Sequence, residues 1–152
     1  VMRSYPSFLR LMAQNALQVR PALGRWRDFI TEDAPNAPRT INLKQYGVRP
    51  FIEAARIMAF ARGLPQTNTA ERLRAASSAG GLPSREVEAI IASLFFIQGL
   101  RLRHQAQLEK LDEDVANRIN PETLHELDRR TLKESFRLAR DLQSRLQLDF
   151  QL

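Results

Sequence analysis

The longest amphipathic segment of the chain covers residues 84–105 and reads SREVEAIIASLFFIQGLRLRHQ. Four of its apolar side chains recur at helical spacing and would share one face of an α-helix: Val87, Ile90, Ile91 and Leu94. Ser84 has a side chain suited to the N-cap position, where its oxygen can accept a backbone N–H. The pattern predicts a long core helix that begins at Ser84 and runs as far as Leu111.

Polar side chains replace apolar ones further along the same face, at Gln98, Arg101 and Gln105. Burying an arginine charge without a partner costs free energy, so Arg101 is expected to meet a carboxylate, backbone carbonyls or a bound anion. An internal ion pair with an acidic residue of a neighbouring helix explains this position as well as a ligand does. His104 stands beside this face, where a structural or surface role is commoner than catalysis.

The segments on either side predict the rest of a helical bundle. Helical periodicity and helix-ending residues delimit further helices over residues 5–19, 48–62 and 69–78, and a last one that opens at Pro121. Thr69 is the expected cap of the third of these helices. Two short segments, 25–30 and 39–43, flank a turn-rich stretch and predict a small β-hairpin. The predicted fold is mainly α: one helical domain over residues 1–152, with the hairpin inserted after the first helix.

Composition limits the classes of protein that the chain can represent. The 152 residues carry a net charge of +6, mostly from arginine, which suggests an anionic partner, although a solvated basic surface is the simpler explanation. There is no cysteine, no secretory signal and no apolar run long enough to cross a bilayer. We therefore expect a cytoplasmic protein without membrane contact. Because the chain begins at Val1, it is interpreted as a domain excised from a longer protein.

The sequence contains no complete catalytic centre that we can identify. Asp112 and Asp114 form the type of carboxylate pair that holds two magnesium ions in nucleotidyl transfer. Here the pair follows a helix, without a Gly-Ser loop before it, so we interpret it as a solvated acidic loop. His104 and His125 have no carboxylate at metal-ligand spacing, and no metal site is expected. Few aromatic residues accompany the basic ones, so nucleic-acid binding is not expected.

A set of polar residues could receive phosphate. These residues stand at predicted helix starts and on the second strand of the hairpin: Lys44, Arg49, Asn68, Thr69 and Arg72. Lysine and arginine side chains bind phosphate oxygens, and helix N-termini offer free backbone amides. Taken one at a time, each residue is explained better by helix capping or solubility.

Several short motifs in order carry a family resemblance. They are FLRLMAQNAL at 8–17, INLKQYGVRP at 41–50, TNTAERL at 67–73, LRLRHQ at 100–105, NRI at 117–119 and LKESF at 132–136. With them the chain resembles the putative nucleotidyltransferase substrate-binding domain family over nearly its whole length. The resemblance implies a C-terminal helical domain of a bacterial signalling protein. In such proteins a nucleotidyltransferase domain lies upstream, often with CBS or cyclic-nucleotide-binding modules.

The resemblance also implies a non-catalytic role in forming the cleft for a nucleotide or its acceptor. The polar positions inside the family motifs are the implied substrate-binding residues: Lys44, Arg49, Asn68, Thr69, Arg72, Arg101, His104 and Gln105. Magnesium and a nucleoside triphosphate are expected in the active site of the parent protein, and no cofactor is expected in this chain. The expected partners are the upstream nucleotidyltransferase domain, a protein acceptor and a second copy of the chain.

Two other functions are compatible with the sequence. The first is a protein-interaction or dimerisation module whose helices pair with a partner and bind no small molecule. The second is a helical ribonuclease or nucleic-acid binder, suggested by the charge and by the spacing of Arg118 and His125. Because Pro121 interrupts that spacing, the two side chains are not expected to share a helix face.

Overall fold

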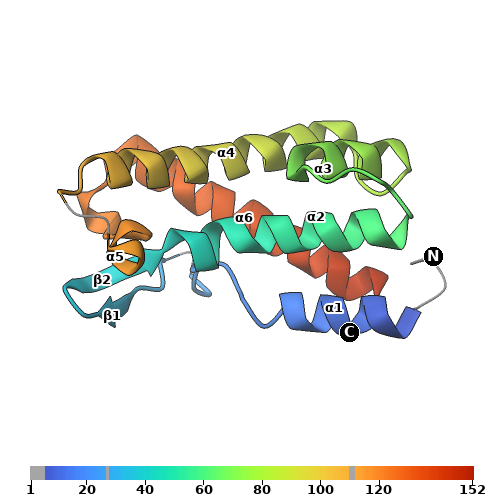
Figure 1. Ribbon diagram of the computed structural model, residues 1–152, viewed down its shortest axis with the longest axis horizontal. Helices are drawn as coiled ribbons and strands as arrows, with labels where there is room; N and C mark the ends of the chain where they lie inside the picture. Colours follow the sequence, from blue (N-terminus) through green and yellow to red (C-terminus); the bar gives the residue numbers. More distant parts are fainter. Residues whose placement is uncertain (1–5, 27, 110–111) are drawn as a thin grey trace.

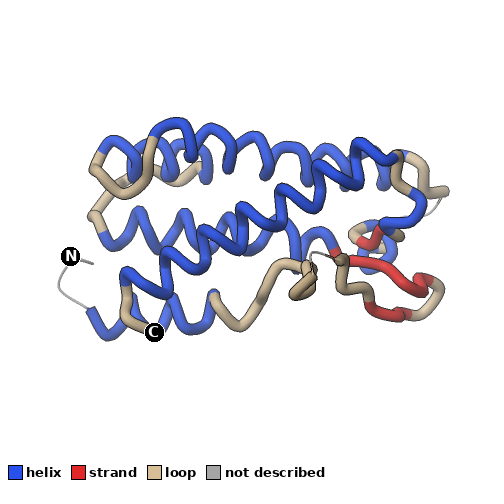
Figure 2. The backbone as a smooth tube through the Cα atoms, turned by 180° about the vertical axis from the view of Figure 1, so that it is seen from behind, coloured by secondary structure: helices blue, strands red, loops and turns tan. Residues whose placement is uncertain are grey.

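The computed structural model describes residues 6–26, 28–109 and 112–152, and it confirms a mainly helical bundle. The helices of the bundle are α1 (Pro6–Ala16), α2 (Arg49–Ala61), α3 (Thr69–Ser78), α4 (Ser84–Ala106) and α6 (Glu126–Asp149). Helix α6 crosses behind α2 and α4 in Figure 1, and Figure 2 shows the same crossing from the other side. It packs against both of them, while α3 packs on α2 and α4.

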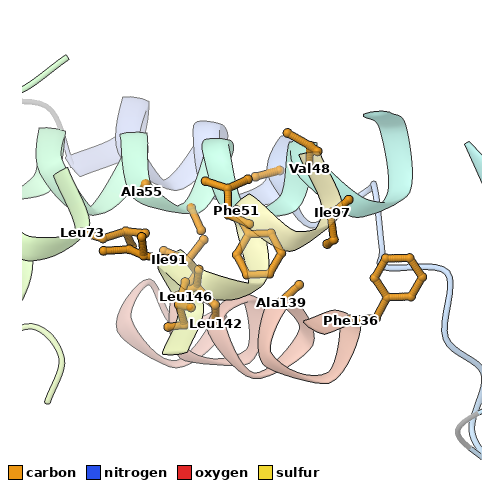
Figure 3. Close-up of a cluster of buried hydrophobic side chains, with 14 of the residues drawn as sticks. Val48, Phe51, Ala55, Leu73, Ile91, Ile97, Phe136, Ala139, Leu142 and Leu146 are labelled. Carbon is orange, nitrogen blue, oxygen red and sulfur yellow. The ribbon is translucent and has the colours of Figure 1, made fainter. Parts of the chain in front are cut away.

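The core is built from the apolar faces that the helical spacing predicts. Phe51 of α2, Ile97 of α4 and Phe136 of α6 have no exposed surface and belong to one cluster (Figure 3). The predicted inward face of α4 is confirmed, because its four apolar positions are all at most 3% exposed: Val87, Ile90, Ile91 and Leu94. Burial of this apolar surface is the main force that holds the helices together.

A turn of π-helix, η2 (Lys44–Val48), leads directly into α2 and lies close to the core. Gly47 lies at the point of closest approach. A Cβ atom there would lie 3.0 Å from Cγ2 of Ile97 and 3.3 Å from Cε1 of Phe136. The absence of a side chain at Gly47 therefore allows η2 to pack against both α4 and α6.

The hairpin is present after α1, but its first strand is not where the sequence pattern predicted it. Strands β1 (Glu32–Ala34) and β2 (Ala37–Asn42) pair antiparallel. The strand predicted over 25–30 is wrong for the described residues of that range, where Phe29 forms an isolated bridge with Leu23, and residue 27 lies outside the described part of the chain. The predicted turn-rich stretch contributes β1 itself and a tight turn, in which Asn36 has a positive φ of 60°. An asparagine tolerates this left-handed conformation, so the turn is shorter than the composition suggested.

A third strand, β3 (Arg118–Ile119), joins the other edge of β2 and gives the order β1-β2-β3. In this pairing Ile41 faces Ile119 and Asn42 faces Arg118. The sheet thus connects the hairpin to the chain segment that follows α4. Figure 1 shows the strands and the short helix α5 (Glu113–Ala116) together at one end of the bundle.

The starts or the caps of three helices differ from the predictions. Asn68, not Thr69, caps α3: its Oδ1 accepts the backbone N–H groups of Ala70 at 2.9 Å and Glu71 at 3.2 Å. Helix α4 does begin with Ser84, but Pro83 occupies the N-cap position and Ser84 makes no side-chain cap. The last helix opens later than predicted, after the 3-10 turn η3 (Pro121–Thr123).

Other boundaries are shorter than the periodicity predicted. Helix α1 ends at Ala16 rather than at residue 19, and α4 ends at Ala106. Residue 5 and residues 110–111 lie outside the described part of the chain, so the predicted start of the first helix and the predicted extension of α4 are not compared there. No helix among the described residues is long and apolar enough to cross a membrane.

Candidate functional site

The short helix α5 is the point where several predicted site residues meet. Its first turn is capped by Asp112, whose Oδ1 accepts the N–H of Asp114 at 3.1 Å, so the predicted acidic loop is a turn of helix. Lys44 forms an ion pair with Glu113, with Nζ and Oε1 3.3 Å apart. His104 contacts the backbone oxygen of Val115 at 3.2 Å through Nε2. α5 thus connects η2 to the last turns of α4.

Arg101 reaches the same region through Asn117, the residue that follows α5. Its Nε and Nη2 atoms donate to Oδ1 of Asn117 at 3.1 and 2.6 Å. Asn117 is 6% exposed, and its own amide nitrogen donates to the carbonyl oxygen of Glu113 at 2.7 Å. The partner is therefore a neutral amide oxygen rather than the carboxylate, backbone carbonyl or anion that the sequence suggested.

This contact leaves the charge of Arg101 without an acidic partner among the residues that the structure describes. No ion pair joins it to an acidic residue in the described part of the chain, and burial lowers the pKa of its guanidinium below the ordinary value. An arginine remains protonated at neutral pH in spite of such a shift. Arg101 is consequently a half-buried cation that two hydrogen bonds hold against a neutral group.

The other two arginines selected from the sequence also bind neutral groups. Arg49 donates from Nη1 to the side-chain oxygen of Gln45 at 3.2 Å. Arg72 donates from Nε to the carbonyl oxygen of Gln66 at 2.8 Å, and its guanidinium carbon lies 5.9 Å from the centre of the Phe60 ring. Burial and hydrogen bonding hold these side chains in place without cancelling their charge.

The eight residues implied by the family motifs do not form one cluster. Lys44, Arg101 and His104 surround α5, while Asn68, Thr69 and Arg72 belong to the start of α3, toward the other end of the bundle (Figure 1). Arg49 lies in the first turn of α2, and Gln105 lies in the last turn of α4. Among the described residues, no hydrogen bond or ion pair joins the α3 group to the α5 group.

An open pocket of about 530 Å³ lies beside α5, between the end of α4, the sheet and the start of α6. Of the eight residues, His104 alone lines it. Its other ionisable lining residues were not selected from the sequence as substrate-binding: Arg103, Arg118, His125 and Asp128. Sequence reasoning missed them because they come from separate elements that only the fold brings together.

Two arginines of the pocket are held by carboxylates. Arg118 has 12% of its side chain exposed and bonds Oε1 of Glu32 at 2.8 Å and Oδ1 of Asp114 at 3.2 Å. Burial disfavours its charge, but these two hydrogen bonds outweigh that effect and raise the pKa of Arg118 above its ordinary value. Arg103 is more exposed and makes a single contact of 3.3 Å to Asp128.

His125 enters the pocket from the N-cap position of α6, where its Nδ1 accepts the N–H of Leu127 at 3.3 Å. Arg118 and His125 lie in β3 and before α6, so they do not share a helix face, as the sequence predicted. They nevertheless line the same pocket, a proximity that the sequence did not predict. The described residues contain no group of three or more histidine, aspartate or glutamate side chains that could hold a metal ion.

Comparison with known protein families identifies the chain. The model of one family, described as "Putative nucleotidyltransferase substrate binding domain", matches residues 6–150. No curated protein and no solved structure matches the chain. The match includes every element of the bundle and the whole α5 region, and it agrees with the resemblance carried by the short motifs. The chain therefore belongs to the family described as "Putative nucleotidyltransferase substrate binding domain".

Proposed function

We propose that this domain is non-catalytic and forms, with a nucleotidyltransferase domain of the same protein, the cleft that holds the nucleotide or its acceptor. The observation that carries the proposal is the environment of Arg101, a half-buried guanidinium held by a neutral amide oxygen. Such a side chain is already oriented and still fully charged, which is what binding an incoming phosphate group requires.

The α5 end of the bundle is the part of the domain that faces the cleft in this proposal. Arg101 would contact phosphate oxygens, Lys44 would add a second charge, and Arg49 and His104 would orient the substrate. Lys44 is exposed and binds Glu113 through one contact of 3.3 Å, so it can exchange that partner for a ligand at little cost. Gln105, at the end of α4, would supply a neutral hydrogen bond.

The α3 group has a different place in the proposal. Asn68 is occupied as the cap of α3, and Arg72 is bound to Gln66 and Phe60. We assign Asn68 to the capping of α3 and Thr69 to its first helical position. Arg72 would contact substrate only where the neighbouring domain extends over that end of the bundle. The α5 group therefore ranks before the α3 group as the substrate-binding surface.

The neighbouring domain would supply magnesium and the transfer chemistry, and this chain would supply charge and position. Phosphoryl and nucleotidyl transfer depend largely on positioning and on stabilising the charge of the transferred group, so arginines fixed in place are effective contributors. The family resemblance extends the proposal to a cytoplasmic bacterial signalling protein with CBS or cyclic-nucleotide-binding modules upstream.

Calorimetric titration tests the proposal. ATP, UTP and CTP with magnesium would be titrated into the chain alone and into the chain joined to its nucleotidyltransferase domain. We expect the joined protein to bind nucleotide more strongly than the chain alone. Arg101→Gln should weaken that binding, because glutamine can still donate to Asn117 but carries no charge. Arg130→Gln is the matched control, since Arg130 lies on α6, outside the α5 region, and pairs with Glu126. Equal binding by both proteins would contradict a shared cleft.

A second function, a dimerisation or interaction module, is favoured by one exposed face of α4. Phe95 and Leu102 stand seven residues apart on α4 and are 56% and 65% exposed. Ala92 and Ala106 extend this face, and Gly99 between them has open space where a Cβ would lie. Apolar and small residues at this spacing are typical of a helix that packs against another helix.

Sedimentation separates the two functions. The dimerisation role predicts a dimer that forms with increasing concentration and is lost in Phe95→Ser. If the joined protein also binds no nucleotide, dimerisation is favoured over substrate binding as the function. A monomer whose joined form binds nucleotide would favour the substrate-binding role.

A further inference from the structure

We propose that the pocket beside α5 binds a phosphate monoester with an apolar or aromatic organic part, such as a nucleoside monophosphate. The inference deepens the proposed function by naming a substrate class, and it rests on that function for its biological role. The binding itself depends only on residues of this chain, so it can be tested without the neighbouring domain.

The size and lining of the pocket suit a small ligand of mixed polarity. A volume of about 530 Å³ lies in the range of ligand sites in proteins. Apolar side chains from α4, α5, β3 and the segment before α6 contribute to the lining: Leu100, Val115, Ile119 and Leu124. They offer a surface for a base or another apolar group, while charged and amide side chains line the remainder.

The polar part offers hydrogen-bond donors, but Glu32 and Asp114 already balance the charge of Arg118, so Arg103 is the cation that a ligand can engage. Arg103 and Arg118 contribute two cations, and Asn36, Gln107 and Asn120 contribute amides. Asp128 is the one carboxylate among the described lining residues, and Arg103 already contacts it at 3.3 Å. Arg103 is 61% exposed, so its planar fork can turn from Asp128 to a phosphate group, which it can bind through two hydrogen bonds.

The two imidazoles are oriented by the backbone. A carbonyl oxygen only accepts, so the contact of His104 Nε2 with Val115 at 3.2 Å places a proton on that nitrogen. His125 Nδ1 accepts the N–H of Leu127, so in neutral His125 the proton lies on Nε2, where it can be donated to a ligand. The chain has two histidines in all, and both line this pocket.

A cationic or amine ligand is the rival that the same pocket could accept, through Asp128. The two ligand classes respond oppositely to Asp128→Asn. This substitution removes a negative charge and frees Arg103, so it should strengthen the binding of a phosphate monoester about fivefold. It would weaken the binding of a cation. The amide keeps the size of the side chain in the first turn of α6.

NMR of the imidazole rings provides the readout. AMP, adenosine and inorganic phosphate would be titrated separately into the 152-residue chain, and His104→Gln and His125→Asn would assign the two sets of ring signals. We expect AMP to shift both rings saturably, with an affinity about tenfold higher than that of adenosine or of inorganic phosphate, because only AMP engages both parts of the pocket. Arg103→Gln should weaken the binding of AMP about tenfold, and Arg130→Gln should leave the affinity for AMP unchanged.

Three results would overturn the inference. They are the absence of saturable ring shifts up to about 10 mM AMP, an affinity for AMP no higher than that for adenosine or phosphate, and weaker AMP binding in Asp128→Asn. Failure of the proposed function would look different. In that case AMP would bind this chain, and its affinity would depend on Arg103. The joined protein would bind nucleotide no more strongly than the chain alone, and Arg101→Gln would not change that binding.

Discussion

Arg101 and Asn117 form a two-point contact in which both guanidinium donors share one amide oxygen, at 3.1 and 2.6 Å. The side-chain amide nitrogen of Asn117 donates to the backbone oxygen of Glu113. The backbone carbonyl oxygen of Asn117 accepts the N–H of Leu43 at 2.8 Å. Asn117 therefore holds together the end of β2, the short helix α5 and the C-terminal half of α4. This places a positive charge, which has no acidic partner in the described part of the chain, at a fixed point of the bundle.

Asn117→Ala should lower the free energy of unfolding by about 2 kcal/mol, because it removes the oxygen that Arg101 binds and the amide N–H that the carbonyl oxygen of Glu113 accepts. Urea unfolding followed by circular dichroism measures the change. Asn15→Ala, at an exposed position of α1, is the control and should change stability by less than about 0.5 kcal/mol. Equal losses in the two variants would mean that Asn117 does not organise this region.

Two glycines in helical segments should respond in opposite directions to alanine. Gly47→Ala places a methyl group 3.0 Å from Ile97 and should destabilise the fold by about 1–3 kcal/mol. Gly99→Ala, where the space is open, should stabilise α4 by about 0.5–1 kcal/mol. Thermal unfolding of both variants shows whether each substitution raises or lowers the stability of the fold. A stabilising Gly47→Ala would show that η2 packs less closely on the core than the distances indicate.

The cap of α3 can be assigned by comparing two neighbouring residues. Asn68→Ala should cost about 1 kcal/mol of unfolding free energy, because two backbone N–H groups lose their acceptor. Thr69→Ala should be close to neutral, since Thr69 is the first residue inside the helix and caps nothing. Denaturant titration of both proteins decides the matter, and a larger loss for Thr69→Ala would restore the assignment made from the sequence.

The ion pair between α3 and α4 predicts a response to acid. The hydrogen bonds of 2.9 and 3.1 Å that Arg74 donates lower the pKa of the Glu88 carboxyl below its ordinary value of 4.5. The ion pair therefore stabilises the fold above about pH 4.5, and this stabilisation is lost as the pH falls through the folded-state pKa of Glu88. NMR titration of the Glu88 carboxyl carbon should show a midpoint below pH 4.5. In Arg74→Gln this midpoint should rise toward 4.5. An unchanged midpoint in that variant would argue against the pair.

The sequence predicts the parts of this fold that depend on local periodicity. The inward face of α4 from Val87 to Leu94 is an example, because side chains at helical spacing must share a face. Residues whose role depends on a distant partner were not predictable in this way. β3 is two residues long and exists because Ile119 pairs with Ile41, so no local pattern marks it.

The candidate site shows the same division. Arg101 stood out because a charge interrupted an apolar face. In the structure it is half-buried, but its partner is the neutral amide oxygen of Asn117 and none of the groups that we expected. Its partner Asn117 carries no local signal, since an amide oxygen becomes a ligand for arginine only when α5 folds against α4. His125 and Arg118 were separated by Pro121 in the sequence, yet the turn η3 brings both to one pocket.

The most direct test of substrate binding is the rate of nucleotidyl transfer by the full protein. Arg101→Gln, which retains a donor for Asn117, should lower kcat/KM by about tenfold or more, the effect expected from loss of a charge-assisted contact to phosphate. Arg130→Gln should leave kcat/KM unchanged, and both variants should unfold at the temperature of the parent protein. Unchanged transfer by folded Arg101→Gln would contradict the claim that the α5 end of this domain binds substrate.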